Sequence, residues 1–123
     1  MVTAFVRQGG FEAGLPEQSL GELDLMIEEI FINLCRYAYP GNSPGDVVIT
    51  HASPAPGSLA VEVADHGIEF NPLAAADPDL TRDLRDWSIG GLGILLVKSL
   101  AKPLSYRREQ GWNRLTFGIS ASQ

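Results

Sequence analysis

The sequence has little of what several protein classes require. It holds a single cysteine, Cys35, so an internal disulfide framework is excluded, and the apolar segment around it indicates a buried, inert thiol. Its two histidines, His51 and His66, lack companions at metal-ligand spacing. No apolar run is long enough to cross a bilayer, and the N-terminus does not resemble a signal peptide. We therefore expect a cytoplasmic protein with no membrane partner.

Basic residues are also scarce. Nine Lys and Arg against fifteen Asp and Glu give a net charge of −6, which disfavours direct binding to nucleic acid or anionic lipid. The 123 residues, 45% of them hydrophobic, suit one compact domain with its own core and leave no room for a second. A single domain over residues 1–123 is the prediction.

The first third of the chain predicts two helices. Apolar residues recur at roughly helical spacing within residues 2–13, but Gly9–Gly10 weakens a helix by about 1 kcal/mol per glycine relative to Ala, so a short or broken helix is expected. Ser19 has the position of an N-cap, with Glu22 completing a capping box. The main helix is expected from about Leu20 to Tyr39, where a Pro- and Gly-rich turn follows.

The rest of the chain predicts strands around a long loop. Two β-branched runs separated by a Pro- and Gly-rich turn predict an antiparallel pair, and the chain closes with a second hairpin around Gln110–Gly111. Residues 66–89 show no clean period and predict a long loop with one helical turn, followed by a helix. Without strict β-α-β alternation, this mixture predicts an α/β (α+β) fold: a two-layer sandwich whose antiparallel-rich mixed sheet carries helices on one face.

The main helix carries polar side chains along one margin of an apolar stripe. At 3.6 residues per turn, one face that should press onto the sheet contains Leu23, Ile27, Ile30, Phe31, Leu34 and Ala38. Glu29 and Asn33 lie one turn apart beside this face, and Tyr37 follows one turn later. They are either solvated flank residues or one wall of a pocket. Leu25 and Ile32 point away from the stripe, so a second helix or a partner should cover them.

Two glycine segments have both an ordinary and a functional interpretation. Asp65 ends a strand beside Gly67, where a carboxylate can accept a hydrogen bond from an exocyclic amine, although Asp-His-Gly is also a common turn. Gly90, Gly91 and Gly93 precede a helix, whose free N–H groups bind anions, although glycines there can also form a simple hinge. The segment lacks the Gly-Lys-Ser/Thr ending of a P-loop.

Together and in this order, the segments resemble the N, G1 and G2 boxes of the Bergerat-type (histidine kinase-like) ATPase superfamily. The matching motifs are Glu29-x-x-x-Asn33, Asp65-x-Gly67-x-x-Phe70-Asn71-Pro72 and Gly90-Gly91-Leu92-Gly93. Within the superfamily, the "FNP" and the closing "NRLTF" are most similar to bacterial anti-sigma factor serine kinases. The similarity spans about residues 15–119, and it implies a Bergerat ATP-binding fold with ATP and Mg²⁺ as cofactors.

The resemblance also implies residue roles. Asn33 would give its side-chain oxygen to Mg²⁺, and Glu29 would act as general base toward a serine hydroxyl. Residues 73–89 would form a lid over the nucleotide. The other implied cofactor contacts are Asp65, Gly67 and Thr116 at the adenine, Gly90, Gly91 and Gly93 at the phosphates, and Arg82 or Arg85 reaching a phosphate from the lid.

The resemblance implies protein partners and leaves alternatives open. The substrate would be an anti-sigma factor antagonist, a sigma factor would be the alternative partner, and the surface with Leu25 and Ile32 suits a homodimer. The alternatives are a nucleotide-gated binding module that transfers nothing, a detached histidine-kinase ATP domain, and an α/β domain without nucleotide. The sequence departs from the family in a first strand that is missing or shortened, in Glu69 where Gly is common, and in Tyr37 where His is frequent.

Overall fold

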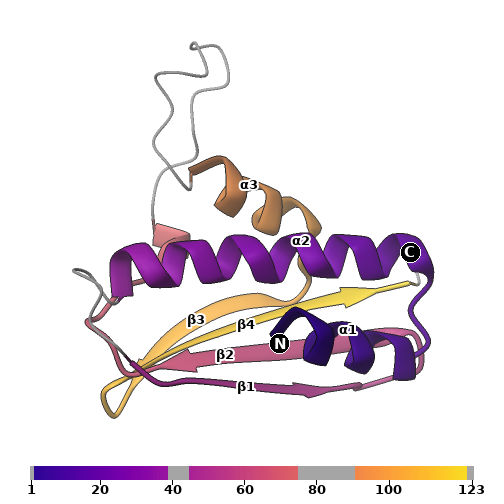
Figure 1. Cartoon of the computed structure of the whole chain (residues 1–123), viewed down its shortest axis with the longest axis horizontal. Helices are drawn as coiled ribbons and strands as arrows, with labels where there is room; N and C mark the ends of the chain where they lie inside the picture. The colour runs from indigo at the N-terminus through magenta and orange to yellow at the C-terminus, as the bar shows by residue number, and fades with distance from the viewer. Residues whose placement is uncertain (1, 39–44, 75–90, 122–123) are drawn as a thin grey trace.

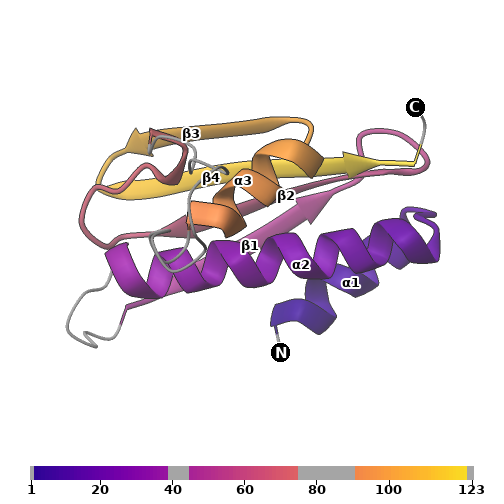
Figure 2. The same cartoon turned by 90° about the horizontal axis from the view of Figure 1, so that it is seen from above.

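A four-stranded antiparallel sheet with helices on one face forms the protein. The computed structural model describes residues 2–38, 45–74 and 91–121. The strands, in the spatial order β1-β2-β4-β3, are β1 Val47–Ala52, β2 Ser58–Asp65, β4 Trp112–Ser120 and β3 Leu104–Glu109. Three α-helices, α1 Val2–Glu12, α2 Glu17–Asn33 and α3 Gly91–Leu100, lie on the same side of this sheet (Figures 1 and 2). The predicted two-layer architecture is confirmed.

Both predicted hairpins are present. β1 pairs with β2 in the register Val47↔Asp65 to Ala52↔Ala60, and β3 pairs with β4 across the Gln110–Gly111 turn. Gln110 and Gly111 have φ values of 51° and 85°, as a two-residue turn of type I′ requires. β2 and β4 are the central strands, and their register places Asp65 opposite Asn113.

Helix α2 covers the middle of the sheet with the predicted apolar stripe. Leu23, Ile27 and Ile30 are buried and belong to one core cluster with Val61, Val97 and Phe117 of the opposing elements. The remaining predicted stripe residues, Phe31, Leu34 and Ala38, belong to the same cluster or pack against it. Leu25 and Ile32 remain 46% and 40% exposed, as expected from their position on the far side.

The predicted start of α2 is wrong by three residues. The helix begins at Glu17 after Pro16, which takes the N-cap position without a side-chain cap, whereas Ser19 is buried inside the helix. Pro16 has the extended backbone of an N-cap residue, and its carbonyl accepts a hydrogen bond from the Leu20 N–H at 3.0 Å. At the other end, α2 stops at Asn33 and continues as a π-helical turn, Leu34–Ala38. Tyr39, the predicted end, lies outside the described residues.

The Gly9–Gly10 pair does not break α1. The helix is continuous through both residues. Close tertiary contacts explain why both are glycine: a Cβ on Gly9 would lie 2.7 Å from the His51 ring, and a Cβ on Gly10 would lie 2.8 Å from Leu20. Arg7 adds ion pairs to Asp24 at 2.5 Å and to Glu17 at 2.6 Å. Packing against α2 and β1 therefore outweighs the poor helix propensity of glycine.

Cys35 is exposed, so the predicted burial of its thiol is wrong. It lies in the π-helical turn three residues after the exposed Ile32 and faces away from the core, because positions three residues apart on a helix share a side. No helix in the described part of the chain is long and apolar enough to cross a membrane.

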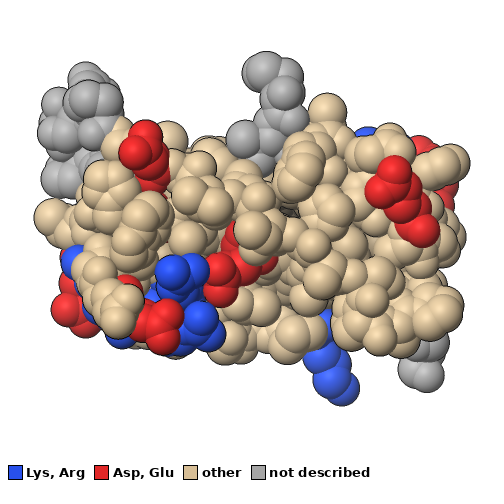
Figure 3. All heavy atoms as spheres, turned by 90° about the horizontal axis from the view of Figure 1, so that it is seen from below, with Lys and Arg blue, Asp and Glu red and all other residues tan. Residues whose placement is uncertain are grey.

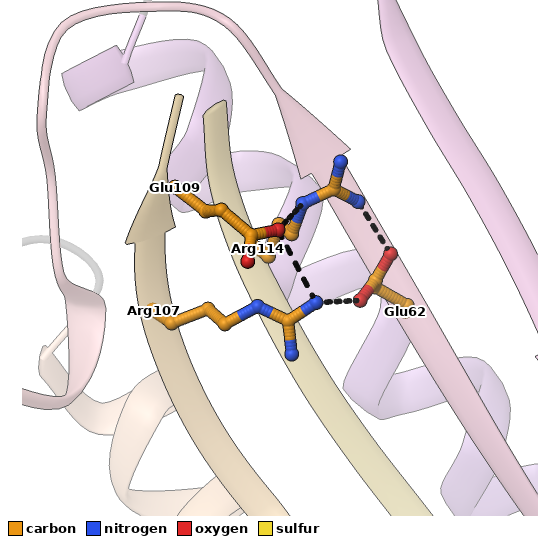
Figure 4. Close-up of polar contacts among 4 residues, drawn as sticks. All are labelled: Glu62, Arg107, Glu109 and Arg114. Carbon is orange, nitrogen blue, oxygen red and sulfur yellow. Dashed lines mark hydrogen bonds and ion pairs between the residues drawn. The ribbon is translucent and has the colours of Figure 1, made fainter. Parts of the chain in front are cut away.

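The sheet face opposite the helices carries a cluster of alternating charges. Glu62 on β2 pairs with Arg114 at 2.9 Å and with Arg107 at 3.7 Å, and Glu109 lies 3.6 Å from Arg107 and 3.3 Å from Arg114 (Figure 4). Seen from this side, most basic side chains cluster with acidic ones toward one end, and further acidic side chains lie at the opposite end (Figure 3). The cluster thus marks the outer surface of β2, β3 and β4.

Candidate functional site

A small, partly open pocket lies between the C-terminal half of α2 and the sheet. Its apolar wall consists of Ile30, Leu34, Val63, Phe70, Pro72 and Leu115, and its polar groups are Asn33, Asp65, Tyr106 and Asn113. A mostly apolar hollow with a few converging polar groups is the usual form of a small-molecule site. Two of the residues predicted from the sequence, Asn33 and Asp65, therefore line one cavity.

Asp65 is a buried carboxylate at the end of β2. It is 5% exposed, and its Oδ1 accepts hydrogen bonds from the Gly67 backbone N–H and from Asn113 Nδ2, both at 2.9 Å. The bond to Gly67 is the turn predicted after the strand, and the cross-strand bond fixes the carboxyl plane. Because both of these bonds use Oδ1, the carboxylate keeps acceptor capacity at Oδ2 for a ligand that donates a hydrogen bond.

Asn113 is a site residue that the sequence motifs did not single out. It is 4% exposed, and its Nδ2 also donates to the Ile68 carbonyl at 2.8 Å. Its Oδ1 accepts from the Phe70 N–H at 3.1 Å and from the Tyr106 hydroxyl at 2.6 Å. The alternation of "NRLTF", which places Asn113 on the same face as Leu115, was the available signal.

The loop after Asp65 is held from the side by β3. Arg108 Nη1 donates to the Gly67 carbonyl at 2.9 Å and to Asn113 Oδ1 at 3.1 Å. Partial burial raises the pKa of the Tyr106 phenol above its ordinary value of 10.0, and the negative charge of Glu69 adds to the rise. The hydroxyl of Tyr106 therefore stays a donor at neutral pH. Glu69, a departure from the family pattern, has an exposed side chain.

Asn33 and Glu29 form the other end of the site. Asn33 is 4% exposed, and its Nδ2 donates to the Glu29 carbonyl at 2.9 Å, so its oxygen is the atom available to a ligand or a cation. The half-buried Glu29 side chain lies directly against Gly93, where a Cβ would come within 2.6 Å of the Glu29 Cδ. The polar margin of α2 thus reaches the first turn of α3.

The glycines of the third motif open α3 as expected. The helix begins at Gly91, so the backbone N–H groups of its first turn have no partner within the helix, and this turn lies beside the Glu29 side chain. Glu29 approaches Gly93 so closely that a side chain there would displace the Glu29 carboxylate, which favours a functional interpretation over a hinge. Gly90, Arg82, Arg85 and most of the predicted lid lie outside the described residues.

Thr116 is not brought to the pocket. Along β4, Asn113, Leu115 and Phe117 are buried toward the helices, so Thr116 points to the opposite face and pairs in register with Glu62 of β2. The predicted support of the adenine contact by Thr116 is therefore wrong. Asn113, three residues earlier, is the β4 residue that contacts Asp65.

Residues 2–119 match the family described as the histidine kinase-like ATPase domain. The chain belongs to this family. It is 32% identical over 94 residues to the serine/threonine-protein kinase BtrW of Bordetella bronchiseptica, a match covering 76% of this chain and 66% of that one. It is 23% identical over 103 residues to the serine-protein kinase RsbW of Listeria monocytogenes, covering 80% and 65%. The chain thus spans just under two thirds of the length of either kinase.

Solved structures show the same fold. The blue-light activated histidine kinase of Erythrobacter litoralis EL346 superposes with a TM-score of 0.58 at 21% identity, over 89% of this chain and 32% of that one. Its separate histidine kinase domain gives a TM-score of 0.59 at 22% identity, over 88% and 47%. The predicted superfamily and fold are confirmed.

Proposed function

We propose that this protein is an ATP-binding anti-sigma regulatory factor that phosphorylates a serine of an anti-sigma factor antagonist. The observation that carries the proposal is the convergence of three separate segments: Asn33 and Asp65 line one pocket, and Glu29, one turn before Asn33, touches the start of α3. Two of the similar proteins are named as serine or serine/threonine kinases, which supports phosphoryl transfer to a hydroxyl group.

The nucleotide would lie along the pocket with its base toward β2 and β4. Ile30, Leu115 and Phe70 offer apolar surface to a flat ring, and Asp65 offers a carboxylate oxygen to its exocyclic amine. Gly67 leaves the backbone open beside that contact. The phosphates would then point toward the N–H groups at the start of α3, at Gly91 and Gly93.

The residues at the phosphate end fit a magnesium ion. Mg²⁺ prefers oxygen ligands, keeps several waters, and is usually held by one or two protein groups together with substrate phosphates. Asn33 supplies such an oxygen, since its nitrogen is engaged with the Glu29 carbonyl. The bound ion would neutralise charge on the transferring phosphoryl group.

Glu29 is the candidate general base. Its carboxylate would accept the proton of the attacking serine hydroxyl while the serine oxygen bonds to the γ-phosphorus and the bond to the β-phosphate oxygen breaks, releasing ADP. Its contact with Gly93 places the carboxylate beside the helix start that would hold the phosphates. Most of the remaining catalysis is positioning, to which the fixed Asp65 end of the pocket would contribute.

The proposed partners are an anti-sigma factor antagonist as substrate and a sigma factor as the alternative partner. The exposed Leu25 and Ile32 on α2 offer an apolar surface for a homodimer.

Incubation with γ-³²P-labelled ATP, Mg²⁺ and each antagonist encoded in the same genome tests the proposal. Labelled serine on one antagonist is expected, and Glu29→Gln should abolish the label. A protein that binds MgATP and a sigma factor without labelling any antagonist would be a nucleotide-gated binding module instead. Absence of MgATP binding in calorimetry would overturn both functions.

A further inference from the structure

The base end of the pocket is organised around one amide. Asn113 forms hydrogen bonds with five groups. Its Nδ2 donates to the Asp65 carboxylate and the Ile68 carbonyl. Its Oδ1 accepts from the Phe70 N–H, the Tyr106 hydroxyl and the Arg108 guanidinium. These groups belong to β2, the following loop and β3. An amide has two donor protons and one acceptor oxygen with two lone pairs, so both protons of Asn113 are used and three donors share its oxygen.

We infer that Asn113 is a positioning residue that sets the base specificity of the pocket, an inference that rests on the proposed ATP site. Its nitrogen donates to Asp65 Oδ1, which the Gly67 N–H also occupies. The Asn113 amide and the Gly67 N–H are both donors, so they hold the Asp65 carboxyl group as an acceptor and leave Oδ2 for the ligand. Such a site takes a base that donates at this edge, as the amine of adenine does, and opposes a carbonyl there.

The direction of its hydrogen bonds distinguishes Asn113 from an apolar or acidic residue of similar shape, because only the amide donates to Asp65. Asn113→Asp would replace Nδ2 by an oxygen. Two carboxylate oxygens would then meet where the hydrogen bond from Nδ2 to Asp65 now measures 2.9 Å, and an acceptor would face the Ile68 carbonyl. The acidic pair would then share a proton or separate, since two like charges at this distance cannot both stay ionised cheaply. Either response removes the fixed acceptor from the base site.

Calorimetry with MgATP and MgITP, whose base carries a carbonyl in place of the amine, tests the inference. The wild-type protein should prefer ATP by roughly 10- to 100-fold, the range expected for a hydrogen bond to a charged acceptor against its loss. In Asn113→Asp, the preference should fall to about threefold or less. Asn113→Thr, which suits a strand and keeps one hydroxyl donor for Asp65, should retain an intermediate preference.

A core variant separates specificity from general loss of stability. Val61 on β2 is fully buried and does not line the pocket, so Val61→Ala should lower the melting temperature and leave the ATP/ITP ratio unchanged. A folded Asn113→Asp protein with the full wild-type ratio would overturn the inference and leave the ATP site standing. Variants at Asn113 that change only the melting temperature would overturn it as well. A wild-type protein that binds neither nucleotide would refute the proposed function, and the inference with it.

Discussion

The two parts of the candidate site, the proposed base end at Asp65 and the proposed phosphate end at Glu29 and Gly93, are held in different ways. At the base end, Asp65 is fixed by Asn113 and Gly67 through hydrogen bonds, and Asn113 is itself fixed from β3. At the phosphate end, Asn33 has one hydrogen bond to its own helix, and Glu29 packs against Gly93. The base end is therefore preorganised by the sheet, and the phosphate end is an approach of two helices.

This difference has a physical origin. Asp65 and Asn113 are register partners on the two central strands, so the backbone ladder places them before any ligand is present. Glu29 and Gly93 belong to helices whose mutual position depends on side-chain packing, and a carboxylate beside unfilled helix N–H groups is favourable until phosphates compete for them. We expect changes at the base end to alter the affinity for ATP and the specificity for its base. Changes at Glu29 should alter the rate of phosphoryl transfer.

The largest effect is expected at Glu29, the candidate general base. Glu29→Gln should lower the rate of serine phosphorylation by roughly 10²–10⁴-fold, the usual contribution of a general base, with ATP affinity nearly unchanged. Single-turnover labelling and calorimetry give the two quantities. Glu28→Gln is the matched control, because Glu28 is the exposed neighbour. Full transfer by Glu29→Gln would show that the base is another group.

Removal of the Asn33 side-chain oxygen should separate binding of the metal ion from binding of the adenine. Asn33→Ala should reduce the affinity for ATP in Mg²⁺ to the value measured in EDTA, at least about tenfold, because the ion loses its proposed protein ligand. Ile32→Ala, at the exposed neighbouring position, is the control. If Asn33→Ala kept the whole magnesium effect, the ion would have other ligands.

A methyl group at Gly93 should disturb the contact between the helices. Gly93→Ala would displace the flexible end of the Glu29 side chain, so transfer should fall by about tenfold, whereas stability should change by less than about 1 kcal/mol because Ala favours the helix. In a Glu29→Ala background the same change should cause no further loss of transfer. Equal losses in both backgrounds would show that Gly93 acts on the phosphates alone.

The smallest effect is expected at Tyr106. Tyr106→Phe removes the hydroxyl donor to Asn113 and should lower the free energy of unfolding by about 1 kcal/mol. Since the folded-state pKa of Tyr106 is raised above 10.0, its contribution is complete below pH 10.0 and is lost as the pH rises through that higher pKa. Urea unfolding at pH 8 and pH 11 should show this pH-dependent contribution in the wild type only, and an identical pH slope in Tyr106→Phe would contradict it.

Local patterns predicted the elements and missed several details that depend on contacts. The stripe of α2 and the turn at Gln110–Gly111 were readable because period and turn chemistry are local properties. The continuity of α1 through Gly9–Gly10 was not, because the His51 ring and Leu20 that require these glycines come from other elements. Thr116 was predicted at the adenine and Asn113 was not named, because a motif gives no strand register and a shift of one residue reverses the face.

The sequence by itself determined which chemical groups are available: a carboxylate and an amide one turn apart on α2, Asp65 before a glycine turn, and glycines at the start of α3. Their order along the chain was enough to indicate the family. Only the tertiary structure decided that Asn113 holds Asp65 and that Glu29 meets Gly93. These contacts join residues 48 and 64 positions apart, and contacts of that range are set by strand register and helix packing, which no local pattern records.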